Sequence, residues 1–357
     1  MTNPSEPKTR PILVRALAGE ATPRAPFWFM RQAGRYLPEY REVRAAAPDF
    51  VAFCLDPAKA CEVTLQPLRR FDMDAAILFA DILLIPHALG AGVAFKAGEG
   101  PVLEPVRDAA AVARLEPALD GAAEALSPVY ETVARVRAAL DPGKALIGFA
   151  GSPWTVATYM VEGGGGHDFM RVRGLALRDP GTFARLVDLL VEATVEYLCR
   201  QAKAGADALQ LFDTWSGVLP ASGFERWVVE PTARIVARLR ARHPGIPVIG
   251  FPRGAGTSLR RYAEATGVDA VGLDAGVAPA WAARELPGRT CLQGNLDPLL
   301  VALGGGAMED ATHAILDAWR KRAFVFNLGH GITPDVPVAN VERLSAILRA
   351  WRRDGEA

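Results

Sequence analysis

The chain lacks any excess of charge. Its 357 residues include 40 Lys and Arg and 40 Asp and Glu, so the formal net charge is zero. Only 6 of the 40 basic residues are lysine, which makes arginine the ordinary cation of this protein. Zero net charge argues against the basic surface of a nucleic-acid-binding protein, and we expect no nucleic-acid partner. A polyanionic ligand would have to be bound by arginines that are clustered locally.

Membrane and export segments are also missing. No run of 18 apolar residues occurs, so no transmembrane helix and no membrane partner are predicted. Residues 1–10 are polar, contain two prolines and lack the apolar core of a signal peptide, which predicts a flexible tail. The four cysteines form no CxxC or His-x-Cys pair and are predicted to be reduced, mostly buried thiols. These absences predict a cytoplasmic protein.

The common cofactor motifs are absent as well. The sequence has no GxGxxG, GxxxxGK[ST] or HExxH, the signatures of dinucleotide, nucleotide and metalloprotease sites. The glycines of 163–166 are not followed by a Lys-Ser/Thr pair, so this run predicts a flexible loop and not a phosphate cradle. We therefore expect no metal and no organic cofactor.

What is present is a regular alternation of apolar strands and amphipathic helices. Strands are predicted at 75–80, 145–150, 207–212, 247–251, 269–273, 290–294 and 323–327, and residues 27–30 are the best candidate for an eighth. Helices are predicted at 56–71, 120–140, from 153 onward, and at 180–204, 221–242, 278–285, 307–321 and 337–352. Residues 92–106 predict a hairpin insertion.

Repeated strand–helix units call for a parallel sheet covered by helices, and eight such units close into a barrel. We predict a single, somewhat distorted (β/α)8 barrel of the TIM type over residues 11–357, with no second domain. An open, doubly wound sheet is the alternative. Its dinucleotide-binding form is disfavoured because no GxGxxG follows the first strand.

Polar side chains follow most of the predicted strands, at the end where barrels of this type place their active sites. They are Asp81, Ser152, Asp213, Thr214, Arg253, Asp274, Asn295 and His330. Asp81 is the strongest candidate, because a carboxylate among apolar neighbours needs a cation or several donors. A helix N-cap or a buried ion pair would explain it equally well. No motif assigns a role to Asp213, Arg253, Asp274 or Asn295.

A second concentration of polar groups lies in the stretch 27–41, FWFMRQAGRYLPEYR. Arg31 and Arg35 are four residues apart, with Gly34 between them. Neighbouring guanidinium groups repel unless anions lie between them, and arginine makes forked contacts with carboxylates and phosphates. This spacing predicts a pocket for a ligand with several carboxylates or phosphates. Two arginines on a solvated helix face are the alternative, which Gly34 and Pro38 disfavour.

The stretch 27–41 resembles the N-terminal signature of the uroporphyrinogen decarboxylase family. The stretch 148–163, GFAGSPWTVATYMVEG, is similar to the second signature of the same family. The resemblance continues through the segments 79–81, 209–214 and 327–332, and so covers nearly the whole chain. It also implies a (β/α)8 barrel.

By this resemblance Asp81 accepts hydrogen bonds from the pyrrole N–H groups of the substrate. Tyr159, Thr214 and His330 match substrate-binding positions, although by themselves they could be a packing tyrosine, a helix N-cap and a structural histidine. The remaining substrate-binding residues that the resemblance implies are Arg31, Gln32, Ala33, Gly34 and Arg35.

The implied reaction is removal of the four acetate carboxyl groups of uroporphyrinogen, without a cofactor, by a cytoplasmic homodimer. Two other functions remain open. A methyltransferase of the same fold would need a zinc site, and the sequence has no His-x-Cys ligand pair. A non-catalytic tetrapyrrole carrier would keep the arginine pocket and have no need of Asp81.

Overall fold

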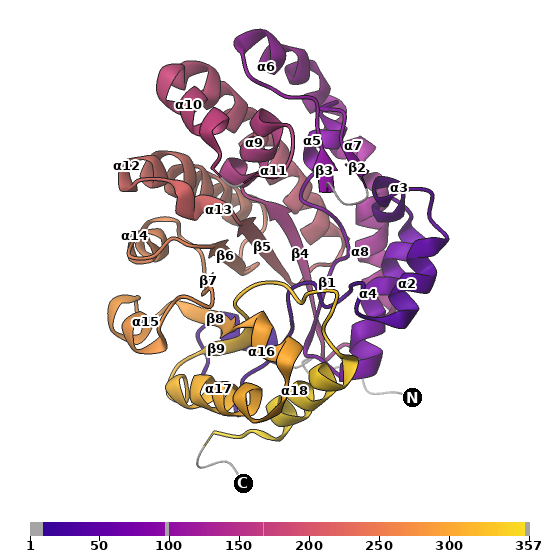
Figure 1. Cartoon of the computed structure of the whole chain (residues 1–357), viewed down its shortest axis with the longest axis vertical. Helices are drawn as coiled ribbons and strands as arrows, with labels where there is room; N and C mark the ends of the chain where they lie inside the picture. The colour runs from indigo at the N-terminus through magenta and orange to yellow at the C-terminus, as the bar shows by residue number, and fades with distance from the viewer. Residues whose placement is uncertain (1–9, 97–99, 167, 354–357) are drawn as a thin grey trace, which may run out of the picture.

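A computed structural model describes residues 10–96, 100–166 and 168–353. Within them one parallel sheet has the order β1-β4-β5-β6-β7-β8-β9 (Figure 1). Its strands are β1 (Ala75–Ile77), β4 (Ala145–Gly151), β5 (Ala208–Asp213), β6 (Val248–Pro252), β7 (Ala270–Gly272), β8 (Cys291–Leu296) and β9 (Phe324–Leu328). All seven predicted parallel strands are therefore present. The tail predicted over residues 1–10 lies, except for Arg10, outside the described residues.

The eighth position of the barrel is occupied by an extended segment and not by a regular strand. Phe27 forms a single parallel bridge with Phe326 of β9. The Phe326 N–H donates to the Pro26 carbonyl (2.8 Å), and the Asp74 N–H donates to the Phe27 carbonyl (3.0 Å). Residues 26–27 thus lie between β9 and the start of β1 and connect the two edges of the sheet. The fold is the predicted (β/α)8 barrel, distorted at this position.

The strand β1 is shorter than the predicted 75–80. The Leu78 N–H still donates to the Ile147 carbonyl of β4 (2.9 Å), but the next N–H, that of Phe79, donates to the Thr64 hydroxyl (3.0 Å). Thr64 belongs to the helix α4 (Pro57–Phe71), so a side chain replaces the neighbouring strand as the partner. The backbone therefore leaves the sheet after Leu78, three residues before Asp81.

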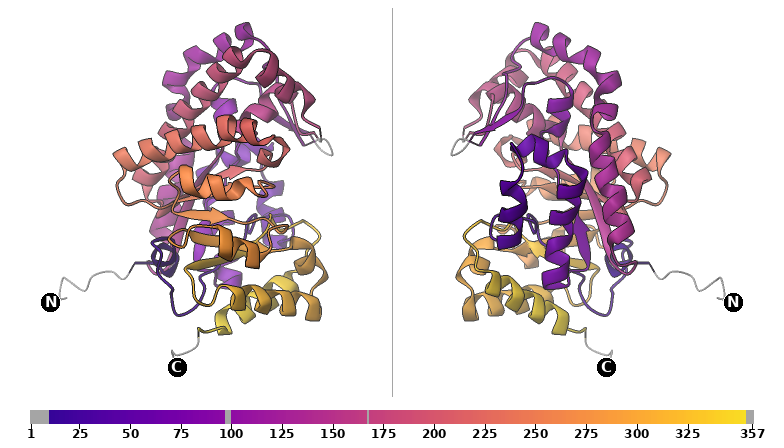
Figure 2. Two further views of the ribbon diagram at one scale, coloured as in Figure 1. Left: turned by 90° about the vertical axis from the view of Figure 1, so that its left-hand side faces the viewer. Right: turned by 90° about the vertical axis from the view of Figure 1, so that its right-hand side faces the viewer.

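The helices surround the sheet (Figures 1 and 2). Besides α4 they are α1 (Ile12–Leu17), α2 (Pro38–Ala45), α3 (Phe50–Cys54), α5 (Leu84–Ala88), α6 (Ala109–Leu115), α7 (Leu119–Ala125), α8 (Ser127–Ala139), α9 (Pro153–Glu162), α10 (Met170–Arg178), α11 (Pro180–Ala204), α12 (Ala221–Phe224), α13 (Glu230–Arg242), α14 (Ser258–Ala265), α15 (Pro279–Glu285), α16 (Pro298–Leu303), α17 (Gly305–Ala318) and α18 (Val338–Ala350). Of these, α6 and α10 lie at the opposite end of the molecule from α17 and α18 (Figure 2). None of the described helices is long and apolar enough to cross a membrane.

The long helices follow their predicted bounds because their first residues are encoded locally. Asp56 and Asp179 each accept backbone N–H groups of the first turn, and a proline follows each of them. Two predicted helices are interrupted. The region 120–140 is divided at Leu126 into α7 and α8, and 221–242 contains a π-helical turn, Glu225–Val229, between α12 and α13.

The predicted hairpin is formed by β2 (Ala94–Lys96) and β3 (Gly100–Val102), and its turn at 97–99 lies outside the described residues. Val102 makes an isolated bridge with Gly164, and the Leu103 N–H donates to the Gly163 carbonyl (3.1 Å). The glycine run predicted as a loop thus holds the hairpin against the end of α9.

Side chains fill the barrel interior. The fully buried Trp28 donates to Gln293 (2.9 Å), and Gln293 donates to Gln210 (3.2 Å), which connects three positions of the barrel. At the N-terminal ends of the strands, buried Asp74 forms ion pairs with Arg24 and Arg349. Because the interior is packed, a ligand has access only to the loops at the ends of the strands.

Candidate active site

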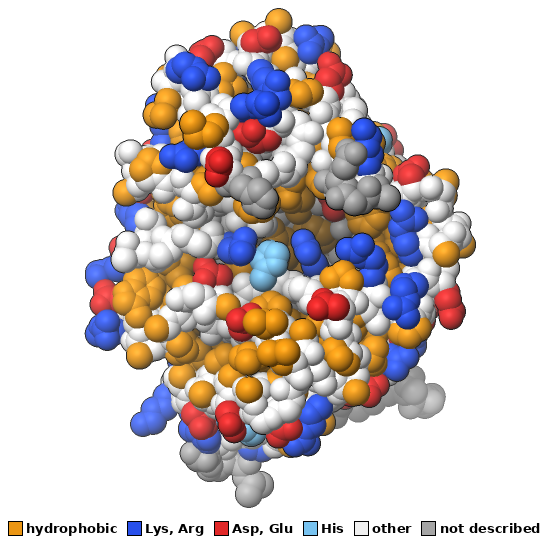
Figure 3. Space-filling model, in the orientation of Figure 1, with side chains coloured by type: hydrophobic (Ala, Val, Ile, Leu, Met, Phe, Trp, Pro, Cys, Tyr) orange, Lys and Arg blue, Asp and Glu red, His pale blue; other side chains and the backbone are white. Residues whose placement is uncertain are grey.

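A hollow crosses the middle of one face of the molecule (Figure 3). Within it a histidine side chain lies between Lys or Arg side chains, and several acidic side chains lie nearby (Figure 3). Basic and acidic side chains therefore lie together around this hollow, and Asp274, Asp297 and Asp335 line the cavity beside His330.

Asp81 follows β1 and is half-buried. Its Oδ1 accepts the Leu83 N–H (2.8 Å), and its carboxylate has no ion-pair partner within 4 Å in the described part of the chain. Burial raises the pKa of the Asp81 carboxyl to about 6, although the Leu83 N–H and the charge of Arg31 lower it. Leu83, and not Asp81, precedes the first residue of α5, so the N-cap alternative does not hold. Near neutral pH Asp81 is a mostly ionised carboxylate with acceptor capacity to spare.

Arg31 lies among three of the predicted site residues. Its charge lowers the pKa values of Asp81, Tyr159 and His330, so it is close to all three. Its side chain crosses Gly331, where an added Cβ would lie 2.4 Å from the Arg31 Cδ. The backbone of Arg31 has φ 61°, a left-handed conformation that costs a residue with a side chain about 1 kcal/mol. The fold maintains this strain, and the Arg31 side chain lies against Gly331, next to His330.

His330 follows β9 and is half-buried. Burial, together with the charges of Arg31 and Arg253, lowers the pKa of its imidazole to about 4, although the charge of Asp274 raises it. The imidazole is therefore neutral at pH 7 and offers one hydrogen-bond donor and one acceptor. Its loop is held closely, because a Cβ at Gly329 would lie 2.3 Å from the Ala275 nitrogen.

Tyr159 lies in α9, as predicted, and packs against Trp215 with the ring centroids 6.1 Å apart. Burial raises the pKa of its phenol, so the hydroxyl keeps its proton at neutral pH. Thr214 is half-buried directly before Trp215 and caps no helix, since the short turn Ser216–Val218 begins after Trp215.

A buried contact positions Trp215. The Thr155 hydroxyl donates to the carboxylate of Asp213, and the Trp215 N–H donates to the same hydroxyl oxygen (3.0 Å). Burial raises the pKa of Asp213 to about 7. Sequence reasoning missed Thr155 and Trp215. The only signal was their position, one inside the second signature and one beside Thr214.

The other residues of the first stretch differ in their placement. Arg35 is exposed, and its guanidinium has no hydrogen bond or ion pair within the described ranges. Gln32 is fully buried, and its side-chain amide accepts the Phe29 N–H (3.1 Å) and donates to the Ala75 carbonyl (3.2 Å). Its side chain is turned away from the hollow. Ala33 and Gly34 are half-buried in the turn before α2.

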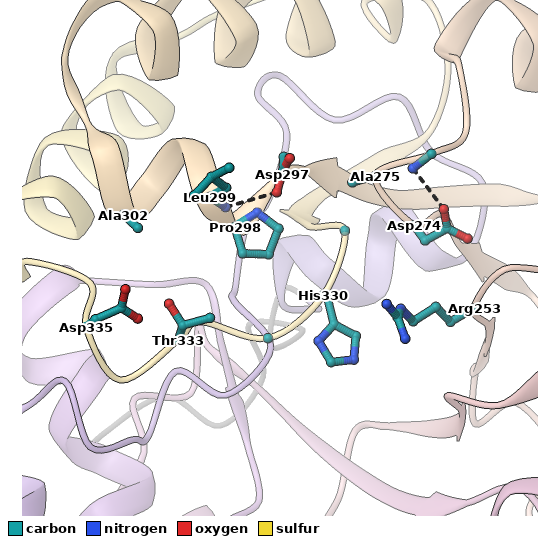
Figure 4. A pocket seen from close by; sticks show the side chains of 13 residues that line it. Arg253, Asp274, Ala275, Asp297, Pro298, Leu299, Ala302, His330, Thr333 and Asp335 are labelled. Atoms are coloured by element: carbon teal, nitrogen blue, oxygen red, sulfur yellow. Dashed lines mark hydrogen bonds between the residues drawn. The ribbon is translucent and has the colours of Figure 1, made fainter. Parts of the chain in front are cut away.

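Three residues without a predicted role line or support a cavity of about 470 Å³ beside His330 (Figure 4). Asp274 accepts the N–H groups of Gly254 (2.7 Å) and Gly276 (2.9 Å). Asn295 donates to the Asp274 carbonyl (2.9 Å) and so supports the same loop. Arg253 lies next to His330 in the cavity wall (Figure 4).

Metal ligands do not gather in the part of the chain that is described, where no group of three or more His, Cys, Asp or Glu could hold an ion. All four cysteines are free. Cys54, Cys199 and Cys291 are buried and Cys61 is half-buried, as expected for structural thiols.

Comparison with known proteins identifies the family of the chain. The family model described as uroporphyrinogen decarboxylase (URO-D) matches residues 8–351. Uroporphyrinogen decarboxylase from Novosphingobium aromaticivorans is 54% identical over 341 residues, which cover 96% of this chain and 99% of that protein. The enzyme of that name from Rhodospirillum rubrum is 52% identical over 345 residues, 97% of this chain and 99% of its own.

A solved methyltransferase from Methanosarcina mazei has a TM-score of 0.74, covering 94% of this chain and 97% of its own, at 16% identity. That likeness concerns the fold alone. The match over residues 8–351 and the identities above 50% over almost the full length are specific, and the chain belongs to the uroporphyrinogen decarboxylase family.

Proposed function

We propose that this protein removes the four acetate carboxyl groups of uroporphyrinogen III to give coproporphyrinogen III. The relatives that share more than half of its residues over almost their full length are named uroporphyrinogen decarboxylase. The observation in the structure that carries the proposal is a half-buried carboxylate, Asp81, next to an arginine without an ion-pair partner in the described residues, Arg31. The zinc methyltransferase alternative has only a shared fold in its favour.

Loss of CO2 leaves an electron pair that must be accommodated. A reduced pyrrole can accept it after the α-carbon next to the carbon that bears the acetate arm is protonated, which creates an iminium-like cation conjugated with that carbon. The carbon–carboxyl bond then breaks, its electron pair restores a neutral ring with an exocyclic double bond, and CO2 departs. A second proton converts the exocyclic carbon into a methyl group, and loss of the first proton from the ring carbon restores the aromatic pyrrole. Each turn consumes one proton and releases one CO2, with no external oxidant or reductant.

Asp81 is suited to stabilise the cation in this sequence. Its spare acceptor capacity can receive the convergent pyrrole N–H groups, and its negative charge opposes the positive charge that develops on the ring. A fixed charge acts most strongly where water is excluded, as at a half-buried site. Because the carboxylate is already in place before the reaction, little reorganisation is needed.

The remaining site residues are proposed to bind and orient the macrocycle. Arg31 and Arg35 bind the acetate and propionate carboxylates, while the neutral His330, the phenol of Tyr159 and the hydroxyl of Thr214 supply hydrogen bonds. Three further residues, Gln32, Ala33 and Gly34, are proposed to contribute through their backbone, in the turn before α2. The side chain of Gln32 is already hydrogen-bonded inside the protein, so its proposed part is limited to the turn.

The proton donor is constrained by these pKa values. A guanidinium holds its proton too tightly to be a matched acid at neutral pH. His330 is neutral in the free protein because its pKa is about 4. Carboxylates bound next to His330 would offset the nearby positive charges and raise its pKa, so His330 becomes a better acid in the complex than in the free protein.

We also propose, on the family resemblance, that the protein acts as a homodimer in the cytoplasm. Sedimentation analysis of the purified protein tests the oligomeric state, and a mass of one chain at micromolar concentration would contradict it.

The direct test is anaerobic incubation with uroporphyrinogen III, followed by oxidation and chromatography of the porphyrins. We expect successive products with seven, six, five and four carboxyl groups. Binding of the tetrapyrrole without loss of any carboxyl group would contradict the proposal and favour a carrier.

A further inference from the structure

Two arginines of the hollow lie on opposite sides of the barrel. Arg31 follows the segment that occupies the eighth position, between β9 and β1. Arg253 follows β6, and the strand order places β6 four positions away from that segment in either direction around the ring. The cluster predicted from the sequence, Arg31 and Arg35, occupies only one of these sides.

The backbone of Arg253 is held firmly while its guanidinium is left without a partner. Its N–H donates to the Asp213 carbonyl (3.0 Å), and its carbonyl accepts the Gly217 N–H (3.2 Å) and the Ser216 hydroxyl (3.0 Å). The side chain is half-buried, yet its guanidinium has no hydrogen bond or ion pair to any residue that the structure describes. Most arginines of this protein that are as well enclosed donate to carboxylates or carbonyls, as Arg137 and Arg322 do.

Three acidic residues line the same cavity, Asp274, Asp297 and Asp335, and within the described residues none of them forms an ion pair with Arg253. Both oxygens of Asp274 accept backbone N–H groups, from Gly254 and Gly276. Asp297 caps α16 by accepting the Leu299 N–H (2.9 Å). Their oxygens stabilise loops around the cavity, so the positive charge of Arg253 remains available to a ligand.

The cavity gives this charge a place to act. Arg253 and His330 lie next to one another in its wall (Figure 4), and its volume of about 470 Å³ accommodates a flexible carboxylate-bearing arm. The pKa of His330 is lowered by both Arg31 and Arg253, which places the imidazole within the field of both cations.

We propose that Arg253 binds a carboxylate arm of the substrate on the side of the hollow opposite Arg31, as a second anchor. The inference rests on the proposed function, because a cyclic tetrapyrrole carries carboxylate arms around its whole circumference. Arginines on one side can bind only the arms that face them. Anchors on two opposite sides resist rotation of the macrocycle and so decide which pyrrole faces Asp81.

The test compares Arg253→Ala and Arg253→Lys with Arg289→Ala. Arg289 is exposed and lies just before β8, at the opposite end of the barrel from the hollow. Arg289→Ala is therefore a matched control, because it also removes one arginine. The probe is uroporphyrin, the oxidised compound with eight carboxyl groups, whose binding is measured by fluorescence over a range of salt concentrations. Turnover of uroporphyrinogen is measured separately, and thermal unfolding confirms that each variant is folded.

We expect Arg253→Ala to raise the Kd for uroporphyrin about 10-fold or more and to weaken its salt dependence, because a charge-assisted contact is lost. The KM should rise more than the kcat falls. Arg253→Lys should recover part of the affinity, since the charge remains and the forked geometry does not. Arg289→Ala should match the wild type.

The outcomes separate the anchor from the activity. If the wild type turns over uroporphyrinogen and Arg253→Ala has unchanged Kd and KM, the anchor is overturned and the proposed function remains intact. Wild-type binding without turnover overturns the proposed function, and the Kd comparison still decides the anchor. A wild-type protein that does not bind uroporphyrin overturns both. If Arg253→Ala is unfolded, the Kd of Arg253→Lys decides, and a value equal to that of the wild type contradicts forked binding.

Discussion

Asp81 combines burial, which favours the neutral acid, with a nearby cation, which favours the carboxylate. The pKa of about 6 leaves the group ionised at pH 7 and still far less solvated than a surface aspartate. Perturbed carboxylates in hollows are typical of catalytic sites, although structural groups can show the same shift. Here the carboxylate has spare acceptor capacity, which a purely structural role does not require.

Replacing Asp81 by Asn removes the charge and keeps the shape. We expect kcat to fall about 100- to 1,000-fold, the usual effect of removing a preorganised electrostatic group, with weaker substrate binding. The measurement is anaerobic turnover of uroporphyrinogen. Asp310→Asn, at an exposed position of α17, is the control and should retain full activity. Near wild-type turnover of the Asp81 variant would refute its assignment.

The pH profile should show the same group. If ionised Asp81 is the active form, kcat/KM of the wild type falls as the pH drops through about 6, because the carboxylate becomes protonated. His330 is neutral above pH 5 and adds no step between pH 5 and 8. Asp213 has a pKa of about 7, so Asp213→Asn is the control variant and should keep the step near pH 6. A flat profile from pH 5 to 7 would contradict the role of the carboxylate.

Arg31→Ala and Arg35→Ala should each weaken substrate capture. Both side chains lack an ion-pair partner in the described ranges, so their charges are available to a polyanion. We expect KM to rise about 10-fold or more, less at high salt, and Lys to restore only part of the loss. Steady-state kinetics at two ionic strengths provide the measurement. Unchanged kinetic constants in both variants would show that other residues bind the substrate carboxylates. Arg41 and Arg44 would then be the next to test.

Between elements, α9 and the end of β5 depend on one hydroxyl. Thr155 donates to Asp213 and accepts from the Trp215 N–H, whereas Thr158, one turn later, donates only to the Trp154 carbonyl of its own helix. Thr155→Val should lower the free energy of unfolding by about 1–3 kcal/mol, because a buried carboxyl and a backbone N–H both lose their partner. Urea unfolding measures the change. The same substitution at Thr158 should cost clearly less, and equal costs would show that the link is unimportant.

The elements that the sequence predicted best are those with local signals. The helices α4 and α11 begin at Asp-Pro pairs, and apolar runs marked all seven strands. The short helices α14 and α16 were missed because segments of 8 and 6 residues are too short for apolar periodicity to identify them. The early end of β1 could not be predicted, since it depends on the Thr64 hydroxyl, which reaches Phe79 from a different element.

For the whole molecule, we expect activity without metal, nucleotide, pyridoxal phosphate or thiamine, because the pyrrole itself accepts the electrons. The same reasoning requires the reduced macrocycle. Oxidised uroporphyrin is flat, has two inner N–H groups and resists protonation at carbon, so it should bind and not react. Protein dialysed against a strong chelator is assayed anaerobically with both forms. Activity that one metal restores, or decarboxylation of the oxidised form, would contradict the mechanism.

The sequence by itself determined the fold class, the family and the strand ends near Asp213 and His330, because apolar periodicity and two long signatures are local properties of the chain. The tertiary structure decided which of these residues lie close enough to influence one another electrostatically. It placed Arg31 beside His330 and turned Gln32 into the interior. It also left the Arg253 guanidinium without a partner among the residues that the structure describes, although no motif marks that residue. Such relations depend on closure of the barrel, which brings together positions that are hundreds of residues apart in the sequence. They also depend on burial, which shifts the pKa of each group.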